Sequence, residues 1–418
     1  MAEYSRTNPV LFTEEMRKTY TILAPTMLPL HFQIIANIFN SQGYHMEILE
    51  TSGRQIIETG LKYVHNDTCY PALIVIGQLI DALNSGKYDI NKVALMISQT
   101  GGGCRASNYL SLLRKALAKA GYGHIPVISL NVAGLEKHPG FKLNLTIGLK
   151  LLYGVLCGDL MMLLRNQCRP YEIEEGSSER LAKRWADRIS EQLCRSSHIS
   201  YKKLKQSCAR MIREFEALPR RKEKKVKIGI VGEIYVKFSP LGNNNLEEFL
   251  LSEGAEPVMP GLLDFCLYCV YNSVIDYQLY GIEHKKAVMF HWAFRYLIKK
   301  EKDIIQLIRE NSSFEPMTPF DHTVTLADGL IGMGAKMGEG WLLTAEMAEL
   351  AESGCAGIVC TQPFGCLPNH IAGKGMMKPL RDRYPDVSIV AIDYDPGATQ
   401  INQENRIKLM LANAAGVL

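Results

Sequence analysis

Short apolar runs alternate with longer stretches of helical spacing through the first third of the chain. The runs are bounded by turn residues or glycine and predict strands, whereas apolar positions repeating every three to four residues predict helices. The predicted strands are Tyr20–Pro25, Tyr44–Leu49, Val93–Ser98 and Pro126–Asn131, and the predicted helices are Leu28–Gln42, Ala72–Leu83 and Ser107–Ala120. Strands that alternate with helices of this length indicate a parallel sheet covered on both faces.

The pattern changes at Arg169 and returns at Val226. The segment Arg169–Arg221 is charged and helical in spacing without a strand signal, and the basic run that closes it, Arg220–Lys225, is best interpreted as a solvated linker. The later predicted strands are Val226–Val231, Ile358–Cys360 and Ser388–Ile392, and the later helices are Leu246–Glu253, Leu342–Ser353 and Ile401–Ala414. We therefore predict two α/β domains, residues 1–168 and 226–418, joined by a helical linker at 169–225. The restart at Val226 suggests a second copy of the first domain's plan.

Composition and charge exclude several classes of protein. Of 418 residues, 47% are apolar and 22% are charged, which is the balance of a soluble protein with a substantial core. The net charge of +4 is too small to indicate a binder of nucleic acid or membrane. The most apolar stretch, Ile147–Leu164, contains Lys150 and Asp159, so we expect a buried helix. No secretory signal is visible at the start of the sequence, and we expect a cytoplasmic protein with reduced thiols.

Three of the eleven cysteines stand at junctions between predicted elements. Cys69, in NDTCYP, directly precedes a helix; Cys104, in QTGGGCR, lies between a strand and a helix; and Cys366, in QPFGCLPNH, follows a strand. We expect all three at the carboxyl ends of strands, the edge of an open α/β sheet where such folds place ligands. A helix N-terminus favours the thiolate form that binds metal, and the glycines beside Cys104 leave room for a bulky inorganic group.

The cysteine spacing excludes a structural zinc site of the common kind. Cys266 and Cys269 form the only Cys-x-x-Cys pair, and their apolar surroundings, LLDFCLYCVYN, favour a core segment. Three widely spaced thiolates at one sheet edge instead suit an iron–sulfur cluster. The glycine-rich segment Gly332–Gly340 misses the Rossmann spacing, and the sequence has no Walker lysine motif, so we expect a loop that does not bind nucleotide.

The segments NDTCYP, QTGGGCR, KIGIVGEIYVKFSPLGNNNLEEFL, CTQPFGCLPNH and AIDYDPGATQINQENRIKLML together resemble the 2-hydroxyacyl-CoA dehydratase superfamily, and most of all its activase-related branch. That branch also occurs as the C-terminal part of long fusion proteins. The resemblance runs from about Tyr20 to Ala414. It implies flavodoxin-like α/β domains and a 4Fe–4S cluster held by three cysteines, which match Cys69, Cys104 and Cys366 in spacing.

The chain is also similar to double-cubane cluster proteins, which hold two linked cubanes with six cysteines per subunit. Further candidate ligands are Cys157, Cys266, Cys269, Cys355 and Cys360. Cys360 is the best of them, because it lies six residues before Cys366 at the predicted end of the same strand. The sequence leaves both cluster types, 4Fe–4S and 8Fe–9S, open.

The resemblance also implies a partner and a reaction. A separate ATP-dependent activase of the actin and sugar-kinase type would supply low-potential electrons in trans, and the chain would form a homodimer in an anaerobe. The function would be a difficult reduction or radical dehydration of an acyl-CoA. The alternatives are reduction of a small substrate without CoA and a non-catalytic role as a cluster carrier or scaffold.

Two residues are candidates for acid–base chemistry, and one for charge compensation. His370 lies beside Cys366, and Glu233 lies at a strand end, although residues of either kind are more often structural. We expect the thiolates of Cys69, Cys104 and Cys366 to converge on one buried cluster between the two domains. Arg105 would offset part of its negative charge, with a surface salt bridge as the alternative.

Overall fold

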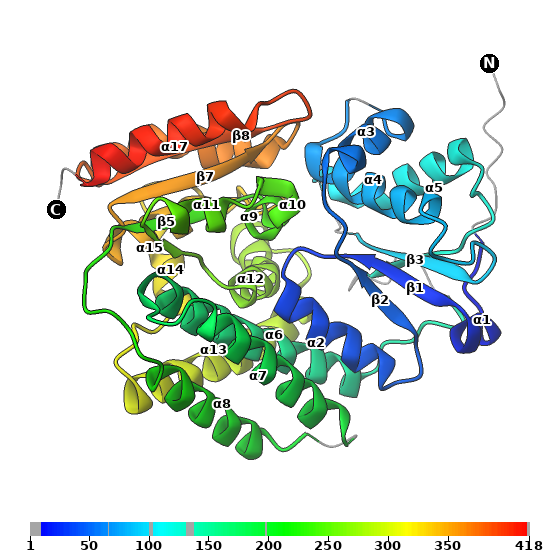
Figure 1. The fold of residues 1–418 in the computed structure, drawn as a ribbon, viewed down its shortest axis with the longest axis horizontal. Helices are drawn as coiled ribbons and strands as arrows, with labels where there is room; N and C mark the ends of the chain where they lie inside the picture. The colour runs from blue at the N-terminus through cyan, green and yellow to red at the C-terminus, as the bar shows by residue number, and fades with distance from the viewer. Residues whose placement is uncertain (1–9, 66, 100–102, 131–137, 197–198, 416–418) are drawn as a thin grey trace. The chain divides into compact units, whose positions relative to one another are not determined.

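A computed structural model describes residues 10–65, 67–99, 103–130, 138–196 and 199–415. The chain divides into two compact units, one of residues Met1–Thr26 and Ile35–Gly148 and the other of residues Met27–Ile34 and Leu149–Leu418. Each unit has its own four-stranded parallel sheet, drawn in blue to cyan for the first and in green to red for the second (Figure 1). The predicted α/β class is therefore confirmed.

The first sheet has the strand order β2-β1-β3-β4. Its central strands are apolar on both faces, as helices on either side of a parallel sheet require. The elements of this unit are α1 (Glu14–Thr19), β1 (Thr21–Pro25), β2 (Met46–Leu49), α3 (Arg54–Tyr63), α4 (Tyr70–Asn84), β3 (Val93–Ser98), η1 (Arg105–Asn108), α5 (Tyr109–Ala120) and β4 (Val127–Leu130). Two helices extend across the division between the units, α2 (Pro29–Asn40) and α6 (Leu145–Cys168). Asn131, the predicted end of the fourth strand, lies outside the described residues.

Helices α3 and α4 pack with their backbones in close approach. A Cβ atom on Gly60 would lie 2.4 Å from the carbonyl oxygen of Leu73, and one on Gly77 would lie 2.3 Å from that of Ile56. Nearly every residue of α4 is buried, so this helix is held from several sides. Because α4 begins at Tyr70, the packing fixes the position of Cys69 at its N-terminus.

The second sheet repeats the plan of the first, with the order β6-β5-β7-β8. Read as 2-1-3-4 in each unit, this is the order of flavodoxin-like folds, and it confirms the predicted second copy. The elements of this unit are η2 (Arg169–Tyr171), α7 (Ser177–Cys194), α8 (Tyr201–Glu216), β5 (Lys227–Gly232), α9 (Ile234–Phe238), α10 (Pro240–Asn243), α11 (Leu246–Ser252), β6 (Glu256–Val258), α12 (Leu262–Tyr280), α13 (His284–Asn311), α14 (Phe320–Leu326), α15 (Trp341–Glu352), β7 (Gly357–Pro363), η3 (Asn369–Gly373), η4 (Lys374–Met376), α16 (Met377–Arg383), β8 (Ser388–Tyr394) and α17 (Gln400–Ala415).

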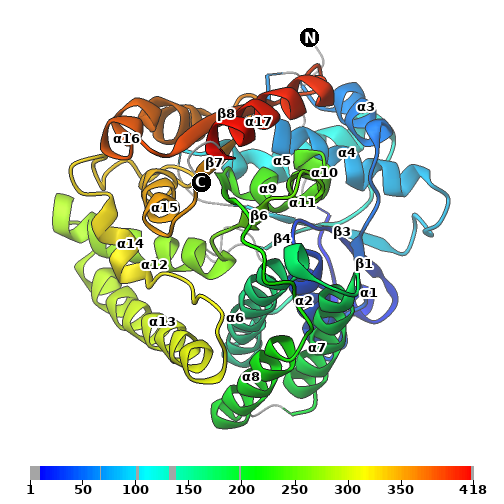
Figure 2. The same ribbon diagram turned by 60° about the vertical axis from the view of Figure 1, so that its left-hand side comes forward.

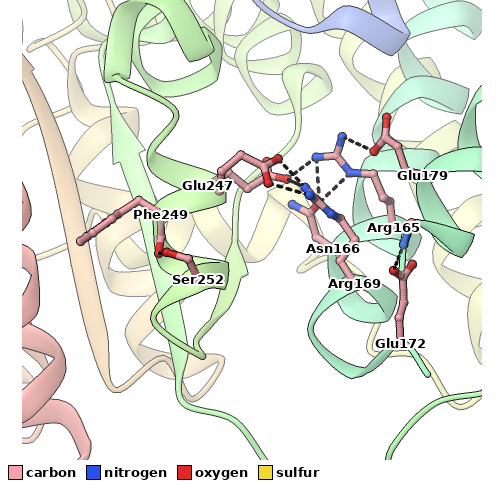
Figure 3. A network of polar contacts seen from close by, with 10 residues as sticks. Arg165, Asn166, Arg169, Glu172, Glu179, Glu247, Phe249 and Ser252 are labelled. Carbon is pink, nitrogen blue, oxygen red and sulfur yellow. Dashed lines mark hydrogen bonds and ion pairs between the residues drawn. The ribbon is translucent and has the colours of Figure 1, made fainter. Parts of the chain in front are cut away.

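The segment predicted as a helical linker forms η2, α7 and α8 and belongs to the second unit. An ion-pair network joins the start of this segment and the end of α6 to α11 of the second unit (Figure 3). Arg165 pairs with Glu179 at 3.5 Å and with Glu247, and Arg169 pairs with Glu247 at 3.2 Å and with Glu248 at 2.7 Å. The two glutamates of α11 lie in its first turn, where the helix dipole also favours negative charge.

Further along the same segment, α8 packs against α13, and the two helices lie side by side in Figures 1 and 2. The hydroxyl of Tyr201 donates to Asp303 at 2.9 Å, and the Lys205 ammonium lies 3.1 Å from the same carboxylate. These contacts anchor the end of the helical segment as the arginines anchor its start.

Helix α6 is long and apolar enough to cross a membrane by length and composition, with a mean hydropathy of 1.8 in its most apolar window. Inside the protein 72% of that window is buried, as in the core helix of a soluble protein. The Asp159 carboxylate accepts hydrogen bonds from His31 Nε2 at 2.7 Å and from the backbone N–H groups of Leu262 and Leu263 at 2.9 and 2.8 Å. It therefore caps the N-terminus of α12 from another helix, and the chain needs glycine at Gly261, where a Cβ would lie 2.7 Å from Asp159 Oδ2.

Candidate functional site

The structure brings two of the predicted cysteines to neighbouring loops of the first unit. Cys69 is the N-cap residue of α4 and Cys104 is the N-cap residue of η1, after β3. The Arg105 guanidinium donates a hydrogen bond to the backbone carbonyl of Asp67, and Cys69 Sγ lies 3.1 Å from the hydroxyl of Tyr109, the first residue of α5. The loop before α4 thus contacts the start of both η1 and α5. Gly101 and Gly102 of the glycine run lie outside the described residues.

Both cysteines stand at the N-terminal ends of helical segments. Exposed N–H groups give a helix N-terminus a partial positive charge. Cys69 and Cys104 are N-cap residues, but neither side chain makes the capping hydrogen bond to its helix. Arg105 adds a full positive charge one residue from Cys104, and its guanidinium donates to the backbone carbonyl of Asp67.

Cys366 lies at the matching position of the second unit. It follows β7, the third strand of its sheet, as Cys104 follows β3, and only 7% of it is exposed. Gly365 makes the turn with φ +73°, and the backbone carbonyl of Cys366 accepts from the N–H of His370 at 3.2 Å. The His370 ring nitrogen Nδ1 lies 2.7 Å from the same carbonyl and 2.5 Å from Gln362 Nε2, and the ring is on the exposed side of the turn.

The sequence predicted Cys360 at the end of its strand, and this prediction is wrong. Strand β7 continues to Pro363, because Thr361–Pro363 pair with Ile392–Tyr394 of β8. The Cys360 side chain is therefore fully buried in the core of the second unit, with Sγ 3.8 Å from Asn369 Oδ1. Burial raises the pKa of this thiol to about 12.

The remaining candidate cysteines are spread over the second unit. Cys157 Sγ lies 3.8 Å from Cys208 Sγ in a buried contact between α6 and α8, and Cys355 belongs to the same core cluster as Cys360. Burial raises the pKa of Cys355 to about 12 as well. Cys266 and Cys269 lie one turn apart on α12, where Cys269 is exposed. Within the described residues, no three His, Cys, Asp or Glu side chains are grouped closely enough to hold a metal ion.

Glu233 forms part of a buried carboxyl pair at the carboxyl edge of the second sheet. It directly follows β5 and caps α9, where its Oε2 accepts from the N–H of Val236 at 2.9 Å. Glu339 Oε1 accepts from the neighbouring N–H of Ile234 at 3.0 Å, so both carboxyls meet the same turn. Burial and repulsion from Glu339 raise the pKa of Glu233 to about 8. The pair therefore retains a proton at neutral pH.

Sequence reasoning missed Glu339 because it lies in the glycine-rich segment Gly332–Gly340. The segment is folded back on itself: Trp341 donates its backbone N–H to the carbonyl of Ala335 at 2.6 Å, and Tyr268 donates to the carbonyl of Lys336 at 2.7 Å. Gly340 takes φ +47°, and a Cβ there would lie 2.2 Å from the oxygen of Ala335. The glycines thus serve to turn the chain so that Glu339 reaches α9.

A buried ion pair joins α9, the helix that Glu233 caps, to α15. Lys237 Nζ lies 3.1 and 3.3 Å from the two carboxylate oxygens of Glu346, and the side chains are 4% and 2% exposed. Two charges so deeply buried are stable only together. The spacing of Lys237 on α9 and Glu346 on α15 gave no sequence signal, because a distance of 109 residues along the chain separates them.

Comparison with known proteins does not add to this picture. No protein-family model matches the chain, and no curated protein matches it.

Proposed function

We propose that the chain is an iron–sulfur redox protein of the 2-hydroxyacyl-CoA dehydratase type, with its cluster held by Cys69, Cys104 and Cys366. The observation that supports this best is the pair of N-cap cysteines on contacting loops at the carboxyl edge of the first sheet. Cys366 repeats that position on the second sheet, so the same fold supplies the third ligand.

The donor set fits such a cluster in its chemistry. Iron–sulfur clusters are held by thiolates, and hydrogen bonds to the ligand sulfurs tune them. The Tyr109 hydroxyl, 3.1 Å from Cys69 Sγ, is placed for such a bond, and Arg105, next to Cys104 in sequence, adds a positive charge to the loops that carry the two cysteines. When bound, the cluster would accept and donate single electrons. Cys69 and Cys104 belong to the first unit and Cys366 to the second.

The burial of the additional cysteines favours a single 4Fe–4S cluster over a double cubane. Cys360 and Cys355 lie inside the core of the second unit with raised pKa values, and Cys157 is enclosed between helices. A second cubane would need several of these thiols as deprotonated ligands at one place. A double-cubane reductase of a small substrate is therefore the weaker candidate.

The partners are those that the resemblance implies. Electrons would come from an ATP-dependent activase in trans, and the substrate would be an acyl-CoA; a homodimer stays a prediction. For proton transfer the chain offers the pair Glu233 and Glu339, which holds a proton at a turn beside the strand that precedes Cys366. We assign the role of proton store to that pair rather than to His370, whose ring is bound to Gln362 and a backbone oxygen.

Anaerobic purification with iron and sulfide counts tests the proposal. The expected result is about four irons per chain and a low-potential EPR signal after reduction; about eight would favour the double cubane. Changing Cys69, Cys104 or Cys366 to Ala, one at a time, should remove most of the iron. Cys168→Ala is the matched control, because Cys168 is a fully buried core thiol on α6.

Two results would overturn the assignment. One is a triple Cys69/Cys104/Cys366 variant that keeps its iron. The other is equal iron loss in the Cys168→Ala control, which would mean that iron content reports only on folding. Circular dichroism of each variant separates loss of ligands from loss of structure.

A further inference from the structure

A cavity of about 110 Å³ lies within the second unit, along the edge strand β6. Its lining includes Lys227, the first residue of β5, and all of β6 with the turn that follows it, Glu256–Gly261. Most of its wall is apolar and includes Leu156, Met162, Pro257, Met259 and Met317. Glu315, whose side chain is 68% exposed, also lines it, so the cavity reaches the surface.

Three carboxyl groups from three helices meet this cavity. They are Asp264 of α12, Glu301 of α13 and Glu349 of α15. Glu349 Oε2 accepts from the Thr323 hydroxyl at 2.8 Å, and Glu301 Oε1 accepts from the N–H of Phe320 at 3.0 Å. Glu301 is 1% exposed, yet its Oε2 has no hydrogen-bond partner among the described residues.

The charged groups around the cavity do not balance these three acids. Each neighbouring charge or acid already has a partner: Lys237 with Glu346, Lys227 with Glu315, Asp159 with His31, Lys302 with Asp321, and Glu256 with the hydroxyl of Tyr171. Buried acids without a counter-charge are stable only when protonated or when a cation joins them. An unpartnered buried carboxyl oxygen therefore needs a ligand or a proton to account for it.

Two of the three acids, Glu301 and Glu349, can change charge near neutral pH. Burial is the largest cause in each case and raises the pKa of Glu301 to about 8 and that of Glu349 to about 7. The pKa of Asp264 is also raised, by burial and by repulsion from Glu349, Glu301, Glu346 and Asp159. A bound cation would oppose both effects, so binding would release protons.

We propose that this cavity binds a small organic cation, with an ammonium group at Asp264, Glu301 and Glu349 and a short apolar body against the aliphatic wall. An ammonium group donates up to three hydrogen bonds and can reach acids that come from separate helices. These acids are not grouped closely enough for a metal ion. An engineered apolar cavity of about 150 Å³ takes up benzene, so this one suits a ligand of about five non-hydrogen atoms.

Isobutylammonium and its neutral counterpart isobutanol are the probes. With the full chain at constant chloride, isobutylammonium should raise the thermal midpoint by about 2 °C or more at saturating concentration. Isobutanol should not. Titration calorimetry should show proton release and a roughly tenfold increase in affinity between pH 6.5 and pH 8, because the acids must ionise to bind.

Glu301→Gln keeps the oxygen that accepts from Phe320 and removes the ionisable group, so it should abolish the response to isobutylammonium. Asp264→Asn gives a second, independent variant if the first fails to fold. Glu310→Gln, on the exposed end of the same helix, is the control and should respond as the unchanged protein does. An equal effect of isobutanol, or an unchanged response in both cavity variants, would refute the proposal. Iron content stays a separate readout, so the outcome is independent of the cluster.

Discussion

The two sheets share one strand order and differ in what their carboxyl edges carry. The first edge presents Cys69 and Cys104 at helix N-termini, beside an arginine. The second presents one thiol, Cys366, beside the buried carboxyl pair of Glu233 and Glu339. A repeated backbone plan thus carries two of the proposed metal ligands in one unit and a retained proton in the other. The comparison illustrates how sites are added to a fold without changing it.

The central strands also end differently. β1 ends at Pro25, whereas β5 ends at Gly232, which takes φ +144°. A Cβ on Gly232 would lie 2.0 Å from Thr361 Oγ1, so the strands β5 and β7 approach more closely at this edge than a side chain permits. That approach leads the chain directly into Glu233 and α9.

Gly232→Ala should produce the largest effect on stability and tests whether the second edge depends on this close approach. Backbone strain and a clash with Thr361 together should lower the free energy of unfolding by about 4–5 kcal/mol, measured by urea denaturation. Pro25→Ala at the matching position of the first sheet should cost much less. Similar losses for the two variants would mean that the edges do not differ in this respect.

Lys237→Met removes one partner of the buried ion pair. Glu346 would then be left as a buried, unpaired acid, and the free energy of unfolding should fall by about 3–4 kcal/mol. The double variant Lys237→Met with Glu346→Leu should recover most of that loss, because no isolated charge remains. A double variant as unstable as the single one would contradict this account.

The pH dependence of stability distinguishes the proton-holding edge from the thiol edge. The pKa of Glu233 is raised in the folded state to about 8, so its contribution to stability is fully present below about pH 4.5 and is lost as the pH rises through 8. Glu233→Gln should remove about 2–3 kcal/mol of this decline between pH 5.5 and 8.5. Glu301 and Glu349 titrate in the same range, so the measured quantity is the difference between the variant and the unchanged protein.

Tyr109→Phe should have the smallest effect of the four. It removes the hydroxyl beside Cys69 Sγ. The free energy of unfolding should fall by about 1 kcal/mol, and the iron count should stay unchanged. If iron is lost as fully as in Cys69→Ala, the tyrosine is a ligand or a structural support of the site and not merely a neighbour of the sulfur.

The regular alternation of the chain made most of the fold predictable. β3 has the predicted bounds, Val93–Ser98, because an apolar run of that length between polar turns has few alternatives. β6 was missed, since it has three residues and contains Pro257, which a strand tolerates only at the edge of a sheet. Helix α3 was also not predicted, although its buried residues Ile56 and Gly60 have helical spacing; it has few apolar residues overall.

The candidate site residues also fall into those that the sequence predicted and those that it missed. Cys104 and Cys366 lie at local junctions between strands and helices, which sequence periodicity reveals. Cys69 was expected at the end of a strand but lies between two helices, α3 and α4; only the start of the helix that follows it was evident from the sequence. Glu339 and the acids of the cavity were not predicted, because their burial depends on how separate helices pack. A carboxyl on an amphipathic helix is ordinarily a surface residue, and only the tertiary structure shows otherwise.

The contact between His31 and Asp159 imposes an order on folding during synthesis. Residues 27–34 cluster with the second unit although the rest of the first 148 residues do not, and 128 residues separate the histidine from its acceptor. At typical ribosomal rates the acceptor emerges on the order of ten seconds later. Until then the segment after β1 has no native partner for His31. Residues 27–34 therefore cannot reach their native contacts while only the first unit has been made, and a fragment ending near residue 148 should keep this segment open to proteases.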